Sequence, residues 1–398
     1  MIACIRIPYF AATLEMRQNL RAGARPLIVA RYSGGRGSVR AVCRRAEYLG
    51  VEVGMSMSRT WALCPEAEVV MMVPSRIRQA LDNLLEMLSD YSQWLDMERQ
   101  ATQTAVLFVD LGKLKPCDGQ AIAAQMLRRL CDDHGLAASV GLAAGKFPAY
   151  AAAAAAPPGH AQLVPRGEEA AFLAAKPVTL LPLGKETARR FALFGLRYLG
   201  QVAALPRSAL ITQFGKQGGT LHRLASGEDP RRVGRYEPRV VERATLTFDR
   251  AVEDRLIVDR VVGRLLGDLA GKLLDRSLTC REMTLILRFD DQTVLEESIR
   301  LREPISSAIP LYRACQILLG RMVIRQDIAG VELLLGDLEP LLPRQLSLFD
   351  VIEHCDVRAV ILDLIPRYGE ERFYTAGLNP HAAGLPERRF HLESVEVA

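Results

Sequence analysis

The sequence predicts an α+β fold, and three observations lead to that prediction. Residues 105–109, AVLFV, are an unbroken apolar run rich in strand-forming residues and ended by Asp110, which is typical of a strand buried on both faces. On either side of this run, apolar residues recur at helical spacing over residues 77–88 and 122–130. Residues 244–338 then follow the order strand, helix, strand, strand, helix, strand, which is a split βαβ arrangement.

The elements of the first third of the chain are expected to form one sheet with helices on one face. Pro8 ends the first strand, where its missing N–H removes no ladder hydrogen bond. Ser75 is a good N-cap for the helix that opens there, and Gly135 is the expected C′ residue of a later helix. The predicted strands cover residues 2–7, 26–30, 105–109 and 137–142, and the predicted helices cover residues 9–19, 75–88 and 119–134.

The composition is that of a globular protein with several domains. The 398 residues are 49% hydrophobic and 24% charged, and the net charge of +5 suits a polyanionic partner without requiring one. The eight cysteines include no C-x-x-C pair, which argues against a zinc site and for a reducing, cytoplasmic location. Met1 leads directly into a strand, so no signal peptide is expected. No apolar run approaches the roughly 20 residues that cross a bilayer, so no membrane partner is expected.

Residues 31–45 combine arginines with glycines. Glycine lets a backbone approach a ligand closely and arginine suits phosphate, so Arg36 and Arg40 are candidate contacts to DNA. A solvated hairpin loop explains the same stretch equally well on the local sequence alone.

From about residue 177 the pattern changes to short helices separated by glycine-containing turns. A tight helical hairpin points backbone N–H groups and a helix N-terminus outward, which suits a DNA phosphate. Gly184 and Lys185 are placed to contribute to such a contact. An ordinary αα-hairpin is the alternative.

Residues 231–243 form a basic stretch between the helical hairpin and the second α+β module. A charge run of this kind is usually a solvated tether, and it can also contact the DNA backbone. The candidate contacts are Arg231, Arg232, Arg235 and Arg239.

Six segments, by their order and spacing, resemble the Y-family of translesion DNA polymerases over about residues 1–350. They are PYFAATLE at 8–15, EYLGVEVGMSMSRTWALCP at 47–65, VDLGKL at 109–114, GLAASVGLAAGKFPAYAAA at 135–153, LPLGKE to FGLRYLGQVAALP at 181–206, and QFGKQGGTLHRLASGEDP at 213–230. More narrowly, the chain resembles the ImuB branch, which has lost polymerase residues.

The resemblance implies a right-hand fold with a palm, small fingers, a helix-hairpin-helix thumb and a βαββαβ little finger. The implied boundaries are palm at 1–20 and 74–170, fingers at 21–73, thumb at 171–231, basic linker at 232–243, little finger at 244–340, clamp-binding peptide at 341–350 and C-terminal tail at 351–398.

The resemblance also implies which residues stand at the polymerase active site. Active members hold two metal ions with a carboxylate cluster. In this alignment Arg6 and Pro8 replace two aspartates, Asp110 is retained, and Leu111 replaces the neighbouring glutamate. Because arginine stays protonated, it repels a divalent cation. We therefore expect no catalytic residues, no bound metal beyond Asp110 as a vestigial ligand, no cofactor and no enzymatic activity.

The alternative is an active error-prone Y-family polymerase that uses Mg²⁺ at an unrecognised arrangement of acids, such as Glu15 or Asp96. In either case Lys146 matches a lysine that follows a palm strand in the family, and it is a further candidate DNA contact.

A short peptide after the little finger resembles the sliding-clamp-binding peptide of bacterial polymerases. In an extended segment of this type a glutamine hydrogen-bonds in a small pocket, while a leucine and a phenylalanine bury apolar surface. A proline-led linker with chance hydrophobic residues is the alternative. The residues concerned are Gln345, Leu346, Ser347, Leu348 and Phe349.

Together these features predict a non-catalytic adaptor in damage-induced mutagenesis (the SOS response) and translesion DNA repair. The resemblance implies four partners: primer-template DNA, the sliding clamp, an error-prone DnaE-type polymerase and a RecA-like accessory protein of the ImuA type. The other hypotheses are the active polymerase and a DNA-binding domain without a role in replication. DNA affinity should fall steeply with salt and show little sequence preference.

Overall fold

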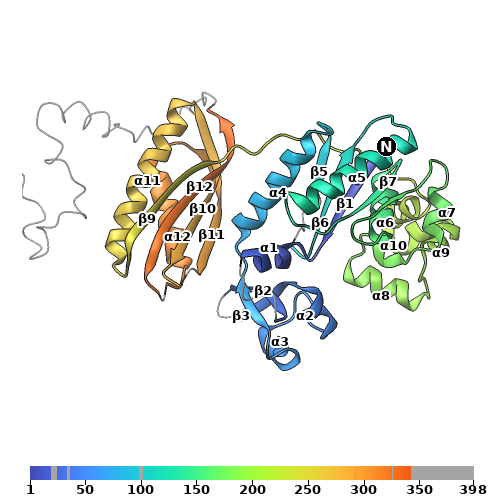
Figure 1. Ribbon diagram of the computed structural model, residues 1–398, viewed down its shortest axis with the longest axis horizontal. Coiled ribbons are helices and arrows are strands. Elements are labelled where there is room, and N and C mark those ends of the chain that lie inside the picture. Colours follow the sequence, from blue (N-terminus) through green and yellow to red (C-terminus); the bar gives the residue numbers. More distant parts are fainter. Residues whose placement is uncertain (19–24, 34–35, 98–101, 292, 325, 342–398) are drawn as a thin grey trace, which may run out of the picture. The chain divides into compact units, whose positions relative to one another are not determined.

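The computed structural model describes residues 1–18, 25–33, 36–97, 102–291, 293–324 and 326–341, all within one compact unit, Met1–Leu341. The elements have the order and type expected for the palm, fingers, thumb and little finger of a right-hand fold (Figure 1). The expected clamp-binding residues 345–349 and the tail at 351–398 lie outside the described residues. In the described ranges, no helix combines the length and the apolar character that a membrane span needs.

A five-stranded sheet forms the centre of the palm, in the order β5-β6-β1-β7-β8 (Figure 1). Its strands are β1 Ile2–Pro8, β5 Leu95–Met97, β6 Thr104–Asp110, β7 Ser139–Ala143 and β8 Ala161–Leu163. β1 is central because it pairs antiparallel with both β6 and β7. Residues 105–109 of β6 are all buried, which confirms the prediction of a strand covered on both faces.

Helices cover both faces of the palm sheet, whereas the sequence predicted helices on one face only. Side chains alternate along β1 and β6, so that Ile5 and Leu107 belong to one core and Cys4 and Phe108 to another. The first core is closed by α1 Phe10–Gln18, α4 Pro74–Ser89 and α5 Pro116–Asp132, and the second by the alanines of α6 Lys146–Ala155.

Two local features of the palm are the start of helix α4, which differs from the prediction, and the glycine at position 141. Helix α4 begins at Pro74 with Val73 as its N-cap, so Ser75 lies inside the helix; proline is favoured there because a first-turn N–H has no partner. Gly141 of β7 permits a close approach of α6, since a β-carbon there would lie 2.0 Å from the carbonyl oxygen of Ala149.

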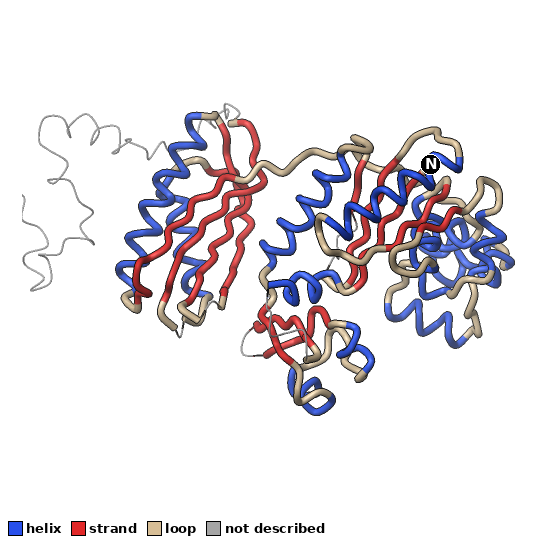
Figure 2. Tube along the Cα trace, in the orientation of Figure 1, coloured by secondary structure: helices blue, strands red, loops and turns tan. Residues whose placement is uncertain are grey.

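The fingers are a small three-stranded sheet with two short helices (Figure 2). The arginine- and glycine-rich stretch forms the antiparallel hairpin of β2 and β3, so most of it is strand rather than open loop. The elements are β2 Leu27–Ser33, β3 Arg36–Val42, α2 Arg44–Tyr48, α3 Met57–Leu63 and β4 Glu68–Met71.

The thumb is a cluster of helices that packs on the palm. Its buried apolar side chains contact Phe147 and Ala151 of α6, which fixes the thumb to that helix. The longest of them was not expected from the sequence, and its backbone is interrupted at Gly215. The elements are α7 Glu169–Ala174, η2 Val178–Leu180, α8 Lys185–Leu193, α9 Leu199–Ala204 and α10 Arg207–Ala225.

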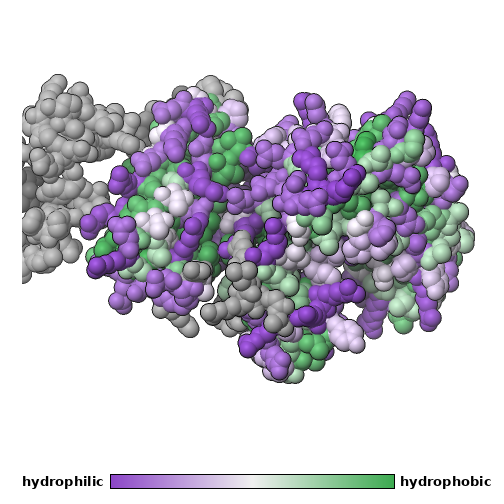
Figure 3. Space-filling view, in the orientation of Figure 1, coloured by the Kyte–Doolittle hydropathy of each residue, from purple (hydrophilic) through white to green (hydrophobic). Residues whose placement is uncertain are grey.

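The little finger is a four-stranded sheet in the order β11-β10-β12-β9, with two helices closing its core. Its elements follow the order strand, helix, strand, strand, helix, strand, which confirms the predicted βαββαβ arrangement. They are β9 Glu242–Val252, α11 Arg255–Asp275, β10 Leu278–Phe289, β11 Val294–Ile305, α12 Ala308–Arg321 and β12 Ile328–Pro340. On the face drawn in Figure 3, hydrophilic side chains cover much of the surface and hydrophobic ones form small separate groups.

Candidate nucleic-acid interface

Arg6 and Asp110 occupy opposite ends of the paired strands β1 and β6. Arg6 pairs with Val106, whereas Asp110 pairs with Ile2, four residues away. At about 3.3 Å per residue this offset is roughly 13 Å. The sequence interpretation placed Arg6 and Asp110 in one carboxylate cluster. The strand register shows that they do not share a cluster.

Asp110 has a structural role at its end of the sheet. Its Oδ1 accepts a hydrogen bond from the backbone N–H of Gly112 at 2.9 Å and lies 4.0 Å from the N-terminal amino group of Met1. Leu111 donates its N–H to the carbonyl of Met1. These contacts close the turn after β6 and fix the start of the chain.

The other end of β1 meets the fingers through a small charged cluster. Pro8 is the last residue of the strand, and Tyr9 follows with φ at 54°, a left-handed conformation that costs a non-glycine residue roughly 1–2 kcal/mol. The Tyr9 hydroxyl donates to Glu47 at 2.5 Å. This hydrogen bond, with burial and the charge of Glu47, raises the pKa of Tyr9, and the nearby cations of Arg44 and Arg6 oppose the shift.

The residues around Arg6 do not fit a divalent metal ion. Its neighbours in the sheet are Val106 and Ser139, and the described ranges hold no group of three or more histidine, cysteine, aspartate or glutamate side chains arranged as metal ligands. The acids considered as substitutes form ion pairs elsewhere: Glu15 with Arg76 at 2.6 Å, and Asp96 with Lys146. Burial raises the pKa of Glu15 although Arg76 opposes the shift. We derive no reaction step through a metal.

A pocket of about 260 Å³ lies where the palm meets the thumb. Lys146, the first residue of α6, enters it with a nearly buried side chain, pairs with Asp96, and lies 5.2 Å from the ring centroid of Phe108. Arg231, at the end of the thumb, lines the same pocket with a half-exposed side chain. The structure thus brings together two of the predicted DNA contacts, a palm lysine and a thumb arginine.

The predicted phosphate contact of the thumb lies at the start of α8. Gly184 is the N-cap, and no side chain hydrogen-bonds to the cap. Gly184 and Lys185 are both exposed. An uncapped helix start presents N–H groups and the positive end of the helix dipole, which suits an anion.

The remaining predicted contacts lie in the fingers and the linker. Arg36 begins β3 in the fingers, and Arg40 is exposed on the same strand. Arg232, Arg235 and Arg239 of the linker are exposed as well.

The first half of the linker is anchored to the palm, so it is not the free tether that the sequence suggested. Val233 is buried in the core beneath α6. Arg235 forms a β-bridge with Trp94, and Tyr236 donates its N–H to the carbonyl of Gln93 at 2.9 Å.

Sequence reasoning missed Asp229, whose buried carboxylate accepts hydrogen bonds from Phe147 and Arg231. Its partner on α6 lies 82 residues away along the chain. The only sequence feature that pointed to Asp229 was its position near the end of residues 213–230, the last segment that resembles the Y-family.

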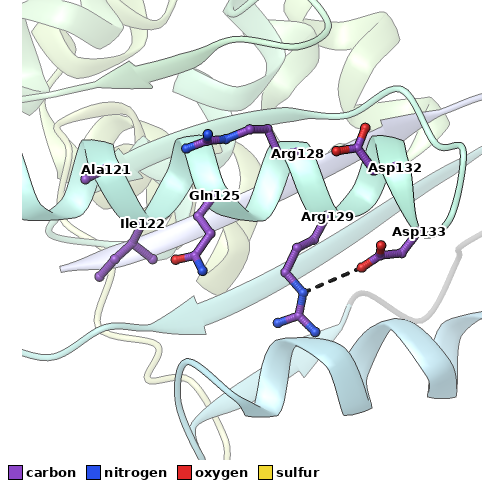
Figure 4. Close-up of a pocket in the computed structure, with 7 residues that line it drawn as sticks. All are labelled: Ala121, Ile122, Gln125, Arg128, Arg129, Asp132 and Asp133. Carbon is purple, nitrogen blue, oxygen red and sulfur yellow. Dashed lines mark ion pairs between the residues drawn. The ribbon is translucent and has the colours of Figure 1, made fainter.

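A larger hollow of about 550 Å³ lies along α5, and an ion pair joins two of its charged side chains, Arg129 and Asp133 (Figure 4). Arg129 pairs with Asp90 at 2.8 Å and with Asp133 at 3.7 Å. We assign no ligand to this surface of a single helix.

Comparison with known proteins identifies the family. The model of the impB/mucB/samB family matches residues 5–154, and the model of its C-terminal domain matches residues 243–348. DNA polymerase IV of Caulobacter vibrioides is 31% identical over 325 residues, which cover 78% of this chain and 77% of the relative. The chain belongs to the impB/mucB/samB family of Y-family DNA polymerases. DNA polymerase IV of Dehalococcoides mccartyi is 28% identical over 328 residues, covering 82% of this chain and 83% of the relative.

Solved Y-family structures share the fold. DinB from Sulfolobus solfataricus matches with a TM-score of 0.54 at 20% identity, over 84% of this chain and 98% of that chain. An insertion ternary complex of Dbh DNA polymerase matches with a TM-score of 0.53 over the same shares.

These relatives correct one prediction made from the sequence. The chain was expected to have no enzymatic activity, and that expectation is wrong, because relatives aligned over about four fifths of it are named for an enzyme, DNA polymerase IV. The comparisons support the Y-family and do not single out the ImuB branch.

Proposed function

We propose that this chain is an error-prone, template-directed DNA polymerase that acts in translesion DNA repair. The observation that carries the proposal is the 31% identity to a DNA polymerase IV over 78% of the chain. This similarity runs far beyond a single motif, and it accompanies the full set of palm, fingers, thumb and little-finger elements.

In this proposal the protein binds primer-template DNA through the phosphates of the DNA backbone. Lys146 and Arg231 contact phosphates at the palm–thumb pocket, and Lys185 with the first N–H groups of α8 contacts another stretch of the backbone. Contacts of this kind position a duplex without reading its sequence, as a polymerase requires. They also make affinity depend strongly on salt.

A template-directed primer-extension assay tests the proposal. The purified chain, supplied with primer-template DNA, the four deoxynucleotides and Mg²⁺ or Mn²⁺, should lengthen the primer only where a template overhang is present. DNA polymerase IV of C. vibrioides is the positive control. A primer that stays unextended under conditions in which the control extends it would contradict the proposal.

We also propose that residues 345–349 dock on the sliding clamp. The support is the sequence Gln-Leu-Ser-Leu-Phe, whose glutamine and two apolar anchors suit a small groove. Pull-down by immobilised clamp should succeed with the full chain and fail with the double variant Gln345→Ala, Phe349→Ala. Retention of the double variant would reject this peptide as the docking segment.

The DnaE-type polymerase and the ImuA-type accessory protein remain predictions from the resemblance to ImuB. A pull-down tests this directly: each purified partner is applied to immobilised clamp with and without the bound chain. Retention that depends on the chain is the expected result, and retention by the clamp alone would count against recruitment.

A further inference from the structure

One buried carboxylate, that of Asp229, connects the palm with the end of the thumb. Asp229 follows the end of α10, and its side chain is fully buried. It accepts a hydrogen bond from the backbone N–H of Phe147 at 2.9 Å. It accepts four more from Arg231: from the backbone N–H at 3.1 Å, from Nε at 2.9 Å to one oxygen and 3.2 Å to the other, and from Nη2 at 2.7 Å.

The contact to Phe147 fixes the start of α6. The first N–H groups of a helix have no partner within it, and the N-cap residue here, Gly145, has no side chain to supply one. Asp229 supplies an acceptor, and its negative charge suits the helix N-terminus. Because Lys146 is the first residue of α6, the same contact fixes the backbone from which its side chain enters the pocket.

The contact to Arg231 fixes a guanidinium. Two of its N–H donors point at the carboxylate, a geometry that sets the plane and direction of the group. The Arg231 side chain remains 53% exposed and lines the same pocket as Lys146. A single acid therefore holds both cations of the pocket, Lys146 through the helix backbone and Arg231 through its side chain.

We propose that Asp229 is a positioning residue for DNA binding, which sets Lys146 and Arg231 at the spacing that two backbone phosphates need. The inference rests on the proposed function, because it takes the DNA backbone as the ligand of the pocket. Asp229 itself does not reach the DNA, since its carboxylate is buried.

The direction in which DNA affinity changes when the Asp229 carboxylate is removed distinguishes a positioning role from a simple effect of net charge. Removal of a carboxylate makes the protein more positive, which by itself strengthens binding to a polyanion. Loss of a positioning residue weakens binding and reduces the number of phosphate contacts. The number of contacts is readable, because the logarithm of the affinity falls by about 0.9 per contact for each tenfold rise in salt.

The experiment measures the dissociation constant for primer-template DNA by fluorescence anisotropy between 50 and 300 mM salt. Asp229→Asn should bind about 5–20-fold more weakly than the unaltered chain, with a salt slope lower by about one contact. The matched control is Asp268→Asn on the exposed side of α11, which changes the charge equally and should bind as tightly as the unaltered chain or slightly tighter. The double variant Asp229→Asn, Arg231→Ala should lose less affinity than the two single losses combined, because the share that Asp229 exerts through Arg231 is already gone and only the share through Lys146 remains.

An Asp229→Asn protein that is folded and binds DNA with unchanged affinity and slope would overturn the inference. If that variant does not fold, Arg231→Lys serves instead, since it keeps the charge and loses the paired donors. Arg231→Lys should then lose most of the affinity that Arg231→Ala loses, and full affinity in Arg231→Lys would overturn the inference. Failure of the unaltered chain to bind DNA would instead reject the proposed function.

Discussion

Lys146 of α6 and Asp96 of β5 form an ion pair in the lining of the palm–thumb pocket. The lysine side chain is 8% exposed and the aspartate 41%, so a ligand reaches the pair from the carboxylate side. A phosphate that enters the pocket must therefore compete with Asp96 for the ammonium group. If DNA binds in this pocket as proposed, such competition gives the two residues opposite effects on DNA affinity.

Neutral substitutions of this pair should change DNA affinity in opposite directions. Asp96→Asn releases the ammonium group of Lys146, so this variant should bind DNA about threefold more tightly. Lys146→Gln removes a phosphate contact, so it should bind about tenfold more weakly, a loss of about 1.4 kcal/mol in binding free energy. Fluorescence anisotropy with primer-template DNA at two salt concentrations measures both. Lys113→Gln, on the exposed turn after β6, is the control. Equal weakening by Lys146→Gln and Lys113→Gln would mean that only net charge matters.

Gly141→Ala should destabilise the palm strongly. A β-carbon at this position lies 2.0 Å from the carbonyl oxygen of Ala149 and 2.3 Å from the backbone nitrogen of Ala153, so α6 must move away from β7. We expect a loss of about 3 kcal/mol in the free energy of unfolding, at the upper end for overpacking. Urea denaturation measures it.

The matched control is Gly320→Ala in α12, where a β-carbon meets open space. Alanine suits a helix better than glycine, so this variant should gain up to about 1 kcal/mol. Similar stability in both variants would show that the approach of α6 to Gly141 is not tight.

The stability of the chain in acid should depend on Asp229. Burial alone raises the pKa of this carboxyl, but the hydrogen bonds and charge of Arg231 and the N–H of Phe147 outweigh burial and hold the pKa below its ordinary value of 3.8. A lowered pKa contributes stability above pH 4 that is lost as the pH falls towards the folded-state value. Between pH 5 and 3, Asp229→Asn should therefore lose less unfolding free energy than the unaltered chain. Parallel losses in the two proteins would contradict this assignment.

Thiol labelling should distinguish exposed from buried cysteines. Cys117 and Cys131 are exposed on α5, whereas burial raises the pKa of Cys280 and Cys315 to about 12. At pH 8 iodoacetamide should modify the first two within minutes and leave the buried pair unmodified until urea is added, because the thiolate is the reactive form. Peptide mass spectrometry of a Cys355→Ser variant identifies which cysteines have been alkylated. Rapid labelling of Cys280 in the native chain would indicate that the little-finger core opens.

Patterns within one segment were the part of the fold that the sequence could predict. The apolar run at 105–109 and the helical spacing over residues 77–88 and 122–130 depend on local periodicity, and β6, α4 and α5 form there as expected. The surroundings of Asp110 depend instead on the pairing of β6 with β1, which no local pattern specifies. The family resemblance placed Asp110 near Arg6, and the register separates them.

The candidate site shows the same limit. Lys146 and Arg231 were found as single basic residues, but their shared pocket arises only when the thumb packs on α6. Asp229 was not found, because a capping carboxylate far along the chain has no sequence signature at the helix it caps. The close approach of α6 to the palm sheet likewise depends on Gly141, where a β-carbon would meet the backbone of Ala149 and Ala153, and no local pattern signals that contact.

Under the proposed function, the anchoring of the linker on Trp94 affects how the protein would hold DNA. Only the six steps from Tyr236 to Glu242 remain to connect the palm with the little finger, a maximum reach of about 21 Å. A free linker from Arg231 would reach roughly 38 Å. The shorter linker, together with the ion pairs of Arg78 on α4 with Glu282 and Glu296 of the little finger, confines the little finger to a much smaller volume beside the palm. If the chain binds DNA as proposed, release by one module would be followed by rapid rebinding, and the whole protein would stay on its template longer than either module alone.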